Sequence, residues 1–238
     1  MPFLTKVRQR RRQPEIMDQP DLDRRRHVLA LRGLERINAW SRSGRILWGP
    51  LRDLTLQTGG RPLRVLDVAT GGGDLPIRLW RRARRAGLDM HLDCCDMSAG
   101  AVAYAAGRAA ECGAEVRFFV RDALSGSLPG GYDALACSLF LHHLSEDQAV
   151  DLLRRMAEAA GRLVLVNDLV RGRAGWLLAY AGTRLLSASE VVRTDGVRSV
   201  EAAYTIAEAH KLAARAGLAG ARVEKRWPCR FLLMWRRP

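Results

Sequence analysis

A buried strand that runs straight into a glycine-rich loop constrains the fold of this chain more than any other feature. Residues 63–68 are apolar except for Arg64 and Asp67, and Thr70-Gly71-Gly72-Gly73-Asp74 follows after a single alanine. Glycines in such a turn let the backbone approach a ligand closely, and the amides that start the next helix can bind it. A strand, loop and helix in this order indicate an α/β protein with a parallel sheet.

The rest of the chain alternates between strand and helix patterns. Apolar runs of strand length are separated by stretches with helical spacing of apolar residues. The last two runs have no helix between them, which predicts an antiparallel pair at the end of the sheet. We expect strands at 63–68, 90–95, 116–120, 134–138, 162–167, 222–227 and 231–236, and helices near 74–86, 98–112, 146–160 and 205–216.

Two regions lie outside this alternation. Residues 1–58 begin with a polar, proline-containing arm and continue with helical spacing from residue 27, so we expect an arm and a helical cover before a domain at 59–238. Residues 171–203 form an apolar insertion, which we expect to act as a lid. Trp176, Tyr180, Arg184, Arg198 and Tyr204 could line such a lid, but a tryptophan or leucine stripe at helical spacing more often packs within the protein than contacts a ligand.

The composition argues against several functional classes of protein. The formal net charge of +14 comes almost entirely from arginine, but few aromatic residues lie among the basic clusters, so nucleic-acid binding is not favoured. No uncharged apolar run is long enough to cross a membrane, and the first residues contain no signal peptide. The 5 cysteines show no zinc-site spacing, so we expect no metal and a cytoplasmic protein.

The details of the glycine loop exclude two nucleotide-binding classes. A dinucleotide fingerprint needs a third glycine where this chain has Pro76, and a P-loop needs a Gly-Lys-Ser/Thr sequence that is absent. Instead, an acidic residue, Asp67, closes the strand before the loop. Two further strands also end in carboxylates, Asp96 and Asp122.

In this order of motifs the chain resembles the class I S-adenosylmethionine-dependent methyltransferases, most closely those of quinone and polyketide pathways. The resemblance implies a Rossmann-like, seven-stranded, mostly parallel sheet with an antiparallel last strand and helices on both faces. It also implies that the loop holds the methionine end of S-adenosyl-L-methionine, that Asp96 binds the ribose, and that Asp122 binds the adenine. The cofactor-binding residues expected on this basis are Asp67, Ala69, Gly71, Gly73, Asp96, Met97, Asp122, Ala123 and Ser138.

Three polar residues follow the fourth and fifth strands, where the acceptor is expected. His142 and His143 lie in the segment Leu-His-His-Leu, and Asp168 follows the fifth strand. A histidine has an ordinary pKa near 6.5 and can remove a phenolic proton. We expect these three residues to be catalytic, although a histidine here can also cap a helix or pack beneath the cofactor.

The function expected from these features is methyl transfer to a small molecule in a biosynthetic pathway. O-methylation of a phenolic or polyketide-derived acceptor is favoured, because the insertion is apolar and aromatic. C-methylation of a quinone-like precursor is an alternative, and an RNA-binding or scaffold role for the fold is a third. A homodimer is possible.

Overall fold

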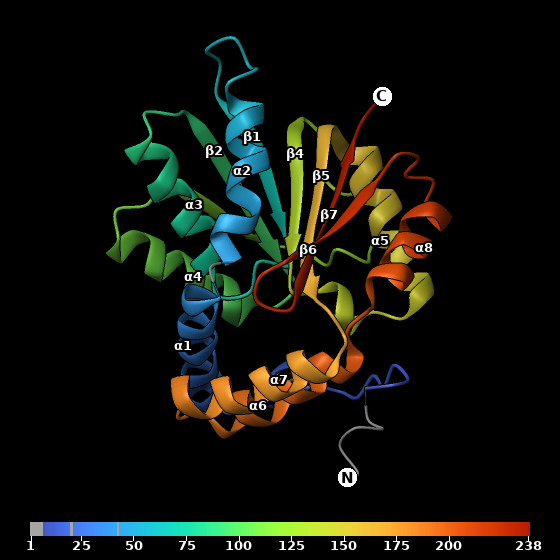
Figure 1. Ribbon diagram of the computed structural model, residues 1–238. Helices are drawn as coiled ribbons and strands as arrows, with labels where there is room; N and C mark the ends of the chain where they lie inside the picture. Colours follow the sequence, from blue (N-terminus) through green and yellow to red (C-terminus); the bar gives the residue numbers. More distant parts are fainter. Residues whose placement is uncertain (1–6, 20, 42) are drawn as a thin grey trace.

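The computed structural model describes residues 7–19, 21–41 and 43–238. Seven strands form one sheet in the order β3-β2-β1-β4-β5-β7-β6 (Figure 1). β1 to β5 are parallel, and β7 runs antiparallel to both β5 and β6. The expected fold class is therefore confirmed. The strands are β1 Leu63–Val68, β2 Met90–Asp96, β3 Val116–Val120, β4 Tyr132–Ser138, β5 Ala160–Leu169, β6 Arg222–Arg226 and β7 Arg230–Arg236.

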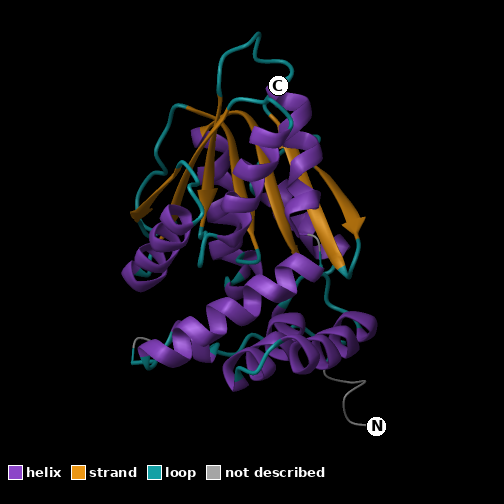
Figure 2. Cartoon of the chain, turned by 90° about the vertical axis from the view of Figure 1, so that its left-hand side faces the viewer, coloured by secondary structure: helices purple, strands orange, loops and turns teal. Residues whose placement is uncertain are grey.

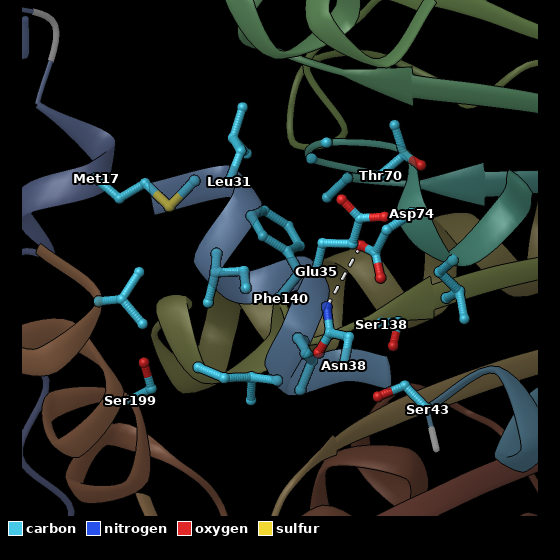
Figure 3. A pocket seen from close by; sticks show the side chains of 18 of the residues that line it. Met17, Leu31, Glu35, Asn38, Ser43, Thr70, Asp74, Ser138, Phe140 and Ser199 are labelled. Atoms are coloured by element: carbon cyan, nitrogen blue, oxygen red, sulfur yellow. Dashed lines mark hydrogen bonds between the residues drawn. The ribbon is translucent and has the colours of Figure 1, made fainter. Parts of the chain in front are cut away.

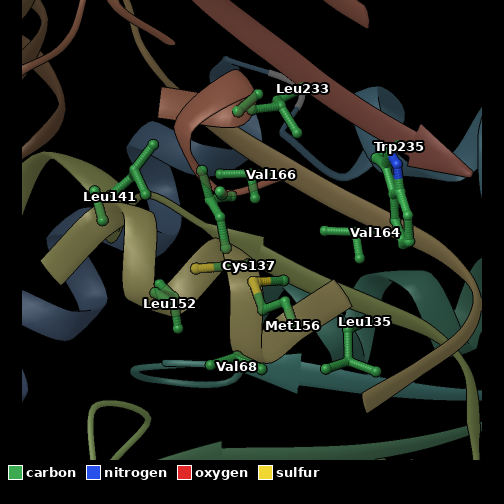
Figure 4. Packing of buried hydrophobic residues seen from close by; sticks show 14 of the residues in the cluster. Val68, Leu135, Cys137, Leu141, Leu152, Met156, Val164, Val166, Leu233 and Trp235 are labelled. Carbon is green, nitrogen blue, oxygen red and sulfur yellow. The ribbon is translucent and has the colours of Figure 1, made fainter. Parts of the chain in front are cut away.

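Helices cover both faces of the sheet. On one face, α2 (Ser43–Thr55) and α3 (Asp74–Arg85) bury leucines against β1 and β2. On the other face, α5 (Glu146–Ala159) and α8 (Ile206–Arg215) pack against β4, β5 and β7 (Figure 4). α4 (Ala99–Glu111) contacts β2 and β3, and begins at Ser98, whose hydroxyl accepts a hydrogen bond from a backbone N–H of its first turn.

A separate helical layer lies across the carboxyl-terminal edge of the parallel strands (Figure 2). It consists of α1 (Arg24–Trp40) with α6 (Arg173–Leu186) and α7 (Glu190–Ala202), so residues from both ends of the chain meet there. Glycines allow this close packing. A Cβ on Gly33 of α1 would lie 2.3 Å from the Ser187 hydroxyl, and one on Gly196 of α7 would lie 2.5 Å from a Thr183 methyl group.

The described part of the N-terminal arm is docked onto the molecule. The Arg10 guanidinium donates to the main-chain oxygens of Ala202, His142 and Leu144 and lies 3.8 Å from the centre of the Tyr204 ring. These bonds attach the arm to α7 and to the turn after β4. Within the described residues, we find no helix long and apolar enough to cross a membrane.

Candidate active site

A cavity of about 1000 Å³ separates the carboxyl-terminal edge of the sheet from the helical layer. Its sheet side consists of the glycine loop and the ends of β2, β4 and β5, where ligands bind in open parallel sheets. Its other walls are α1, α6, α7 and residues 15–19 of the arm. Figure 3 shows Thr70 and Asp74 on one side of this space and Leu31 and Met17 on the other.

The backbone of the glycine loop adopts conformations that favour glycine. Gly71 and Gly73 have positive φ angles of 56° and 70°. A Cβ on Gly73 would lie 2.8 Å from that of Ala105, so glycine is required there for packing beneath the loop. A Cβ on Gly71 would meet no atom within 4 Å, and the Gly71 N–H donates to Asp96 Oδ2 at 2.8 Å. The loop is thus fixed to the end of β2 while its outer side stays open.

Asp67 lies at the bottom of the cavity with half of its carboxylate unsatisfied. Its Oδ2 accepts a hydrogen bond from the Thr70 hydroxyl at 2.7 Å, but its Oδ1 has no partner among the described residues. Burial, assisted by the nearby Asp74 and Asp96 carboxylates and opposed by the Thr70 hydrogen bond, raises the pKa of Asp67 to about 7. A buried, unpaired acceptor of this kind fits a cationic donor such as an ammonium group.

Asp96 lines the cavity at the end of β2, whereas its neighbour Asp93 does not. Asp93 instead accepts hydrogen bonds from the Arg117 guanidinium and the Tyr132 hydroxyl on another part of the surface. The two Asp96 oxygens accept from the backbone N–H groups of Gly71 and Ser98 and keep further lone pairs. Asp96 is therefore positioned both to shape the loop and to bind a ligand.

The remaining residues expected to bind the cofactor lie along the same edge. Met97 is 69% exposed and lines the cavity, as do Asp122, Ala123 and Ser138. The Ser138 hydroxyl is held by the side-chain amide of Asn167 at 2.7 Å. Of the residues expected at the cofactor, those that line the cavity are Asp67, Ala69, Gly71, Asp96, Met97, Asp122, Ala123 and Ser138. Gly73 does not line it, because this part of the loop packs against Ala105.

The two histidines lie at the other end of the cavity and have different carboxylate partners. His142 is buried, and its Nδ1 lies 2.7 Å from Asp168 Oδ1. His143 Nδ1 lies 3.0 Å from Asp18 Oδ2 of the arm. Asp168 does not reach the cavity, because it lies behind His142 and also accepts that residue's backbone N–H. It is thus placed to orient His142 rather than to touch an acceptor.

The electrostatics at this end depend on the arm. Burial alone would lower the pKa of His143, but its hydrogen bond to Asp18 and the negative charge of Glu15 outweigh burial and raise that pKa to about 9. Burial alone would raise the pKa of Asp168, but the charge and hydrogen bonds of His142 lower it.

Among the charged residues of the cavity that sequence reasoning did not assign, four bear on its chemistry. The sequence offers little to single out Glu15 and Asp18, which belong to the polar arm, or Asp74, whose pKa burial raises to about 6. The fourth is Arg230 on β7, which is 3% exposed. Its Nη2 donates to the Ser41 hydroxyl, its other nitrogens have no partner among the described residues, and burial lowers its pKa to about 10.

None of the five residues considered for a lid lines the cavity, in agreement with the packing role that the sequence favours for such residues. Trp176 stacks on Tyr180, and Arg184 lies 3.6 Å from the centre of the Tyr180 ring, all on a face of α6 that points away from the cavity. Arg198 bonds the Pro14 carbonyl, and the Tyr204 hydroxyl donates to the Leu144 carbonyl oxygen. The cavity is lined instead by the small and aliphatic face of α6, namely Gly175, Leu178, Ala179, Gly182, Thr183 and Leu186.

Comparison with known proteins identifies the domain. Residues 65–161 match a family model described as a methyltransferase domain, and they span the glycine loop, Asp96 and the histidine pair. Over these residues the chain is similar in sequence and in fold to the class I S-adenosylmethionine-dependent methyltransferases. The resemblance inferred from the strand-end carboxylates is thereby confirmed.

Curated relatives of this methyltransferase domain come from quinone biosynthesis. The chain is 34% identical over 117 residues to demethylmenaquinone methyltransferase of Thermus thermophilus, covering 48% of this chain and 50% of the relative. It is 30% identical over 147 residues to ubiquinone biosynthesis O-methyltransferase of Xylella fastidiosa, covering 59% and 57%. The chain thus spans about half the length of the curated relatives that it matches.

Solved methyltransferase structures share the fold. Magnesium protoporphyrin IX methyltransferase from Synechocystis, with bound S-adenosylhomocysteine, has a TM-score of 0.56 at 20% identity, covering 85% of this chain and 87% of that one. An O-methyltransferase from neocarzinostatin biosynthesis, in complex with S-adenosylmethionine and 2-hydroxy-5-methyl naphthoic acid, has a TM-score of 0.58 at 24% identity, covering 86% and 55%.

Proposed function

We propose that this chain methylates a hydroxyl oxygen of a phenolic or hydroxyquinone-type small molecule. The observation that carries the proposal is that one cavity joins the glycine loop, with Asp67 and Asp96, to the histidine end formed by His142 and His143. Donor and acceptor would thus lie side by side in a space that helices separate from bulk water. Positioning of this kind contributes about 7–11 kcal/mol to lowering a barrier.

The donor half fits S-adenosylmethionine, which supplies a methyl group on an electrophilic sulfonium. Asp67 Oδ1 would accept the cofactor's ammonium group, and the open side of the loop at Gly71 leaves room for its amino-acid end. Asp96 would accept the ribose hydroxyls with its remaining lone pairs, beside Met97 at the adenine. Asp122, Ala123 and Ser138 would complete this half.

The acceptor half is apolar with a polar end. Leu31 and Leu34 of α1, Leu178 of α6 and Phe140 give it a surface suited to an aromatic ring. The acceptor hydroxyl would lie against His142 and His143, with Asp168 orienting His142. His142 Nε2 would take up the proton of that hydroxyl as the O–CH₃ bond forms and the S–CH₃ bond breaks, with the electron pair of the broken bond going to sulfur.

The proposal is tested by incubating the purified chain with S-adenosylmethionine and a panel of phenols, hydroxyquinones and hydroxynaphthoic acids. We expect S-adenosylhomocysteine to form together with a methyl ether, identified by mass spectrometry and by the ¹³C shift of an O–CH₃ carbon. A C–CH₃ signal would favour the alternative of C-methylation, which the likeness to demethylmenaquinone methyltransferase supports. Absence of turnover with every compound of the panel would contradict both.

A further inference from the structure

Glu15 of the arm stands between the two imidazole rings of the histidine end. Its Oε1 lies 3.7 Å from His142 Nε2, and its Oε2 lies 3.8 Å from His143 Nε2. These separations are too long for hydrogen bonds. They are close to the distance between two ligands of one ion, since ligands at about 2.1 Å in tetrahedral geometry lie roughly 3.4 Å apart. One donor atom from each of the three residues lies within 4.8 Å of the others.

The second nitrogen of each ring is already engaged. His142 Nδ1 bonds Asp168 at 2.7 Å, and His143 Nδ1 bonds Asp18 at 3.0 Å. A neutral imidazole that donates its Nδ1–H to a carboxylate keeps a lone pair on Nε2. In that tautomer both Nε2 atoms present a lone pair toward the Glu15 carboxylate, and a cation would displace the proton that Asp18 and Glu15 otherwise favour on His143. A carboxylate behind each histidine is the arrangement by which proteins orient imidazole ligands of a metal.

The Glu15 carboxylate is held in place by α7. Ser199 Oγ donates to Glu15 Oε1 at 2.6 Å, and the Asp195 carboxylate accepts the backbone N–H groups of Ile16 and Met17 at 3.0 Å each. The carboxylate is therefore fixed beside the rings by contacts that do not involve the rings.

The charge at this point favours a cation. Three carboxylates, those of Glu15, Asp18 and Asp168, surround the two rings. Within the described residues none of the three forms an ion pair with an arginine. Arg10 and Arg12 direct hydrogen bonds to main-chain oxygens of the histidine turn and to a glutamine, and Arg230 acts on Asp168 only through space.

We propose that Glu15, His142 and His143 bind a divalent first-row transition-metal cation. Two imidazole nitrogens and one carboxylate suit Zn²⁺, Fe²⁺ or Co²⁺ better than Mg²⁺ or Ca²⁺, which prefer oxygen ligands. All three residues line the cavity, so the further coordination positions of the cation face the acceptor half. This site goes beyond methyl transfer, since binding of the ion does not require that activity.

The role of the cation does rest on the proposed function. A divalent ion next to an acceptor hydroxyl favours loss of its proton, and it also orients an acceptor that offers two neighbouring oxygens. His142 and His143 would then act as ligands, and the acceptor's proton would pass to water rather than to a histidine.

The test is titration of the full chain, freed of metal with EDTA, by Co²⁺ while its visible absorption is recorded. We expect saturable binding of one ion per chain. Glu15→Gln and His143→Ala should each weaken it about 100-fold or more, and Asp168→Asn, which removes the support of a ligand, about 10–100-fold. His91→Ala and His210→Ala alter exposed histidines remote from the cavity and should bind as the wild type does.

The outcomes separate this site from the proposed function. No saturable Co²⁺ binding by the wild type, or equal binding by Glu15→Gln with unchanged thermal unfolding in EDTA, would overturn the metal site. If Co²⁺ binds as expected while no phenol is methylated, the site stands and the proposed function fails. If methylation persists undiminished in EDTA and no ion binds, the reverse holds.

Discussion

Asp67 shows how one residue can be identified from sequence while its chemical state depends on the fold. Its place at the end of a strand, before glycines, is visible in the chain. Its unpaired oxygen and its pKa of about 7 are not, because they arise from burial beneath the loop and from the approach of Asp74 and Asp96. The same holds for Arg230, whose burial with two nitrogens that lack hydrogen-bond partners among the described residues is created only by the folded chain.

The buried Asp67 should make stability fall as pH rises. The folded protein keeps the Asp67 proton up to about pH 7, whereas an unfolded chain loses it near pH 4. Between these values the folded state holds the extra proton, so the free energy of unfolding falls with pH, on the order of 1 kcal/mol per unit. We expect Asp67→Asn to raise the melting temperature at pH 8, with the gap closing by pH 4.

A matched variant, Asp133→Asn, should change the melting temperature at pH 8 in the opposite direction. The hydrogen bond from Arg61 lowers the pKa of Asp133, so its contribution to stability is present at pH 8 and is lost as pH falls through the lowered pKa. Asp133→Asn should therefore lower the melting temperature at pH 8. Parallel behaviour of the two variants would contradict the assignment of Asp67.

The ribose assignment can be tested on the same strand. Asp96→Asn should weaken S-adenosylmethionine binding about ten- to a hundredfold, because hydrogen bonds to a charged group contribute about 1.5–3 kcal/mol. Asp93→Asn serves as the control, since Asp93 bonds Arg117 and Tyr132 away from the cavity. Calorimetry that finds equal affinities for both variants would rule out Asp96 as the ribose ligand.

Arg230 should favour acceptors that carry a carboxylate. Its buried guanidinium has two nitrogens without partners and lines the cavity, so an anionic acceptor group would gain charge-assisted hydrogen bonds there. We expect Arg230→Met to raise the KM for a hydroxynaphthoic acid more than tenfold while leaving that for the matching naphthol within about twofold. Equal changes in the two KM values would contradict this role.

At the scale of elements, the sheet was predictable and the lid was not. Apolar runs of strand length predict the strands. Because the strands are parallel, the carboxylates at their ends meet at one edge of the sheet. In the sequence, the aromatic residues of α6 stand out as candidates to line the cavity, but Trp176 and Tyr180 stack on each other outside it. The face of α6 that lines the cavity carries Gly175, Leu178 and Gly182 at helical spacing. Which face of an amphipathic helix meets a cavity depends on its neighbours, here α1 and α7.

A larger side chain on the cavity-lining face of α6 should weaken binding of the acceptor without affecting the cofactor. A Cβ on Gly182 would meet no atom within 4 Å, so Gly182→Leu places its side chain in open space at the cavity wall. We expect the acceptor KM to rise at least tenfold with little change in affinity for S-adenosylmethionine. Leu185→Ala, which alters an 83% exposed side chain of the same helix, is the control. An unchanged acceptor KM for Gly182→Leu would place the acceptor elsewhere.

At the scale of the molecule, the arm belongs to the structure of the cavity. Its polar composition suggested a loosely attached segment, yet Arg10 and the Asp195 carboxylate tie it to α7 and to the histidine turn. The contacts join residues far apart in the chain, so no local pattern predicts them.

Loosening the arm should be visible without any substrate. Arg10→Gln removes the bonds to the His142 and Leu144 carbonyl oxygens and the stacking on Tyr204. We expect faster proteolytic cleavage within residues 7–19. Arg11→Gln should cleave at the wild-type rate, because the bond that holds Arg11 uses its backbone N–H. Equal cleavage rates for the two variants would mean that Arg10 does not hold the arm.

The position of the helical layer has a consequence for how such a chain can diversify. The donor half is built from loops of the sheet, whereas most of the apolar acceptor wall is contributed by α1, α6 and α7, which are separate in sequence from the matched domain at 65–161. Under the proposed function, mutations in α6 and α7 would change the choice of acceptor with little effect on the donor half, whereas α1 also contacts the glycine loop through Leu31 and Asn38. Libraries that vary α6 and α7 alone would be an economical route to catalysts for new aromatic substrates.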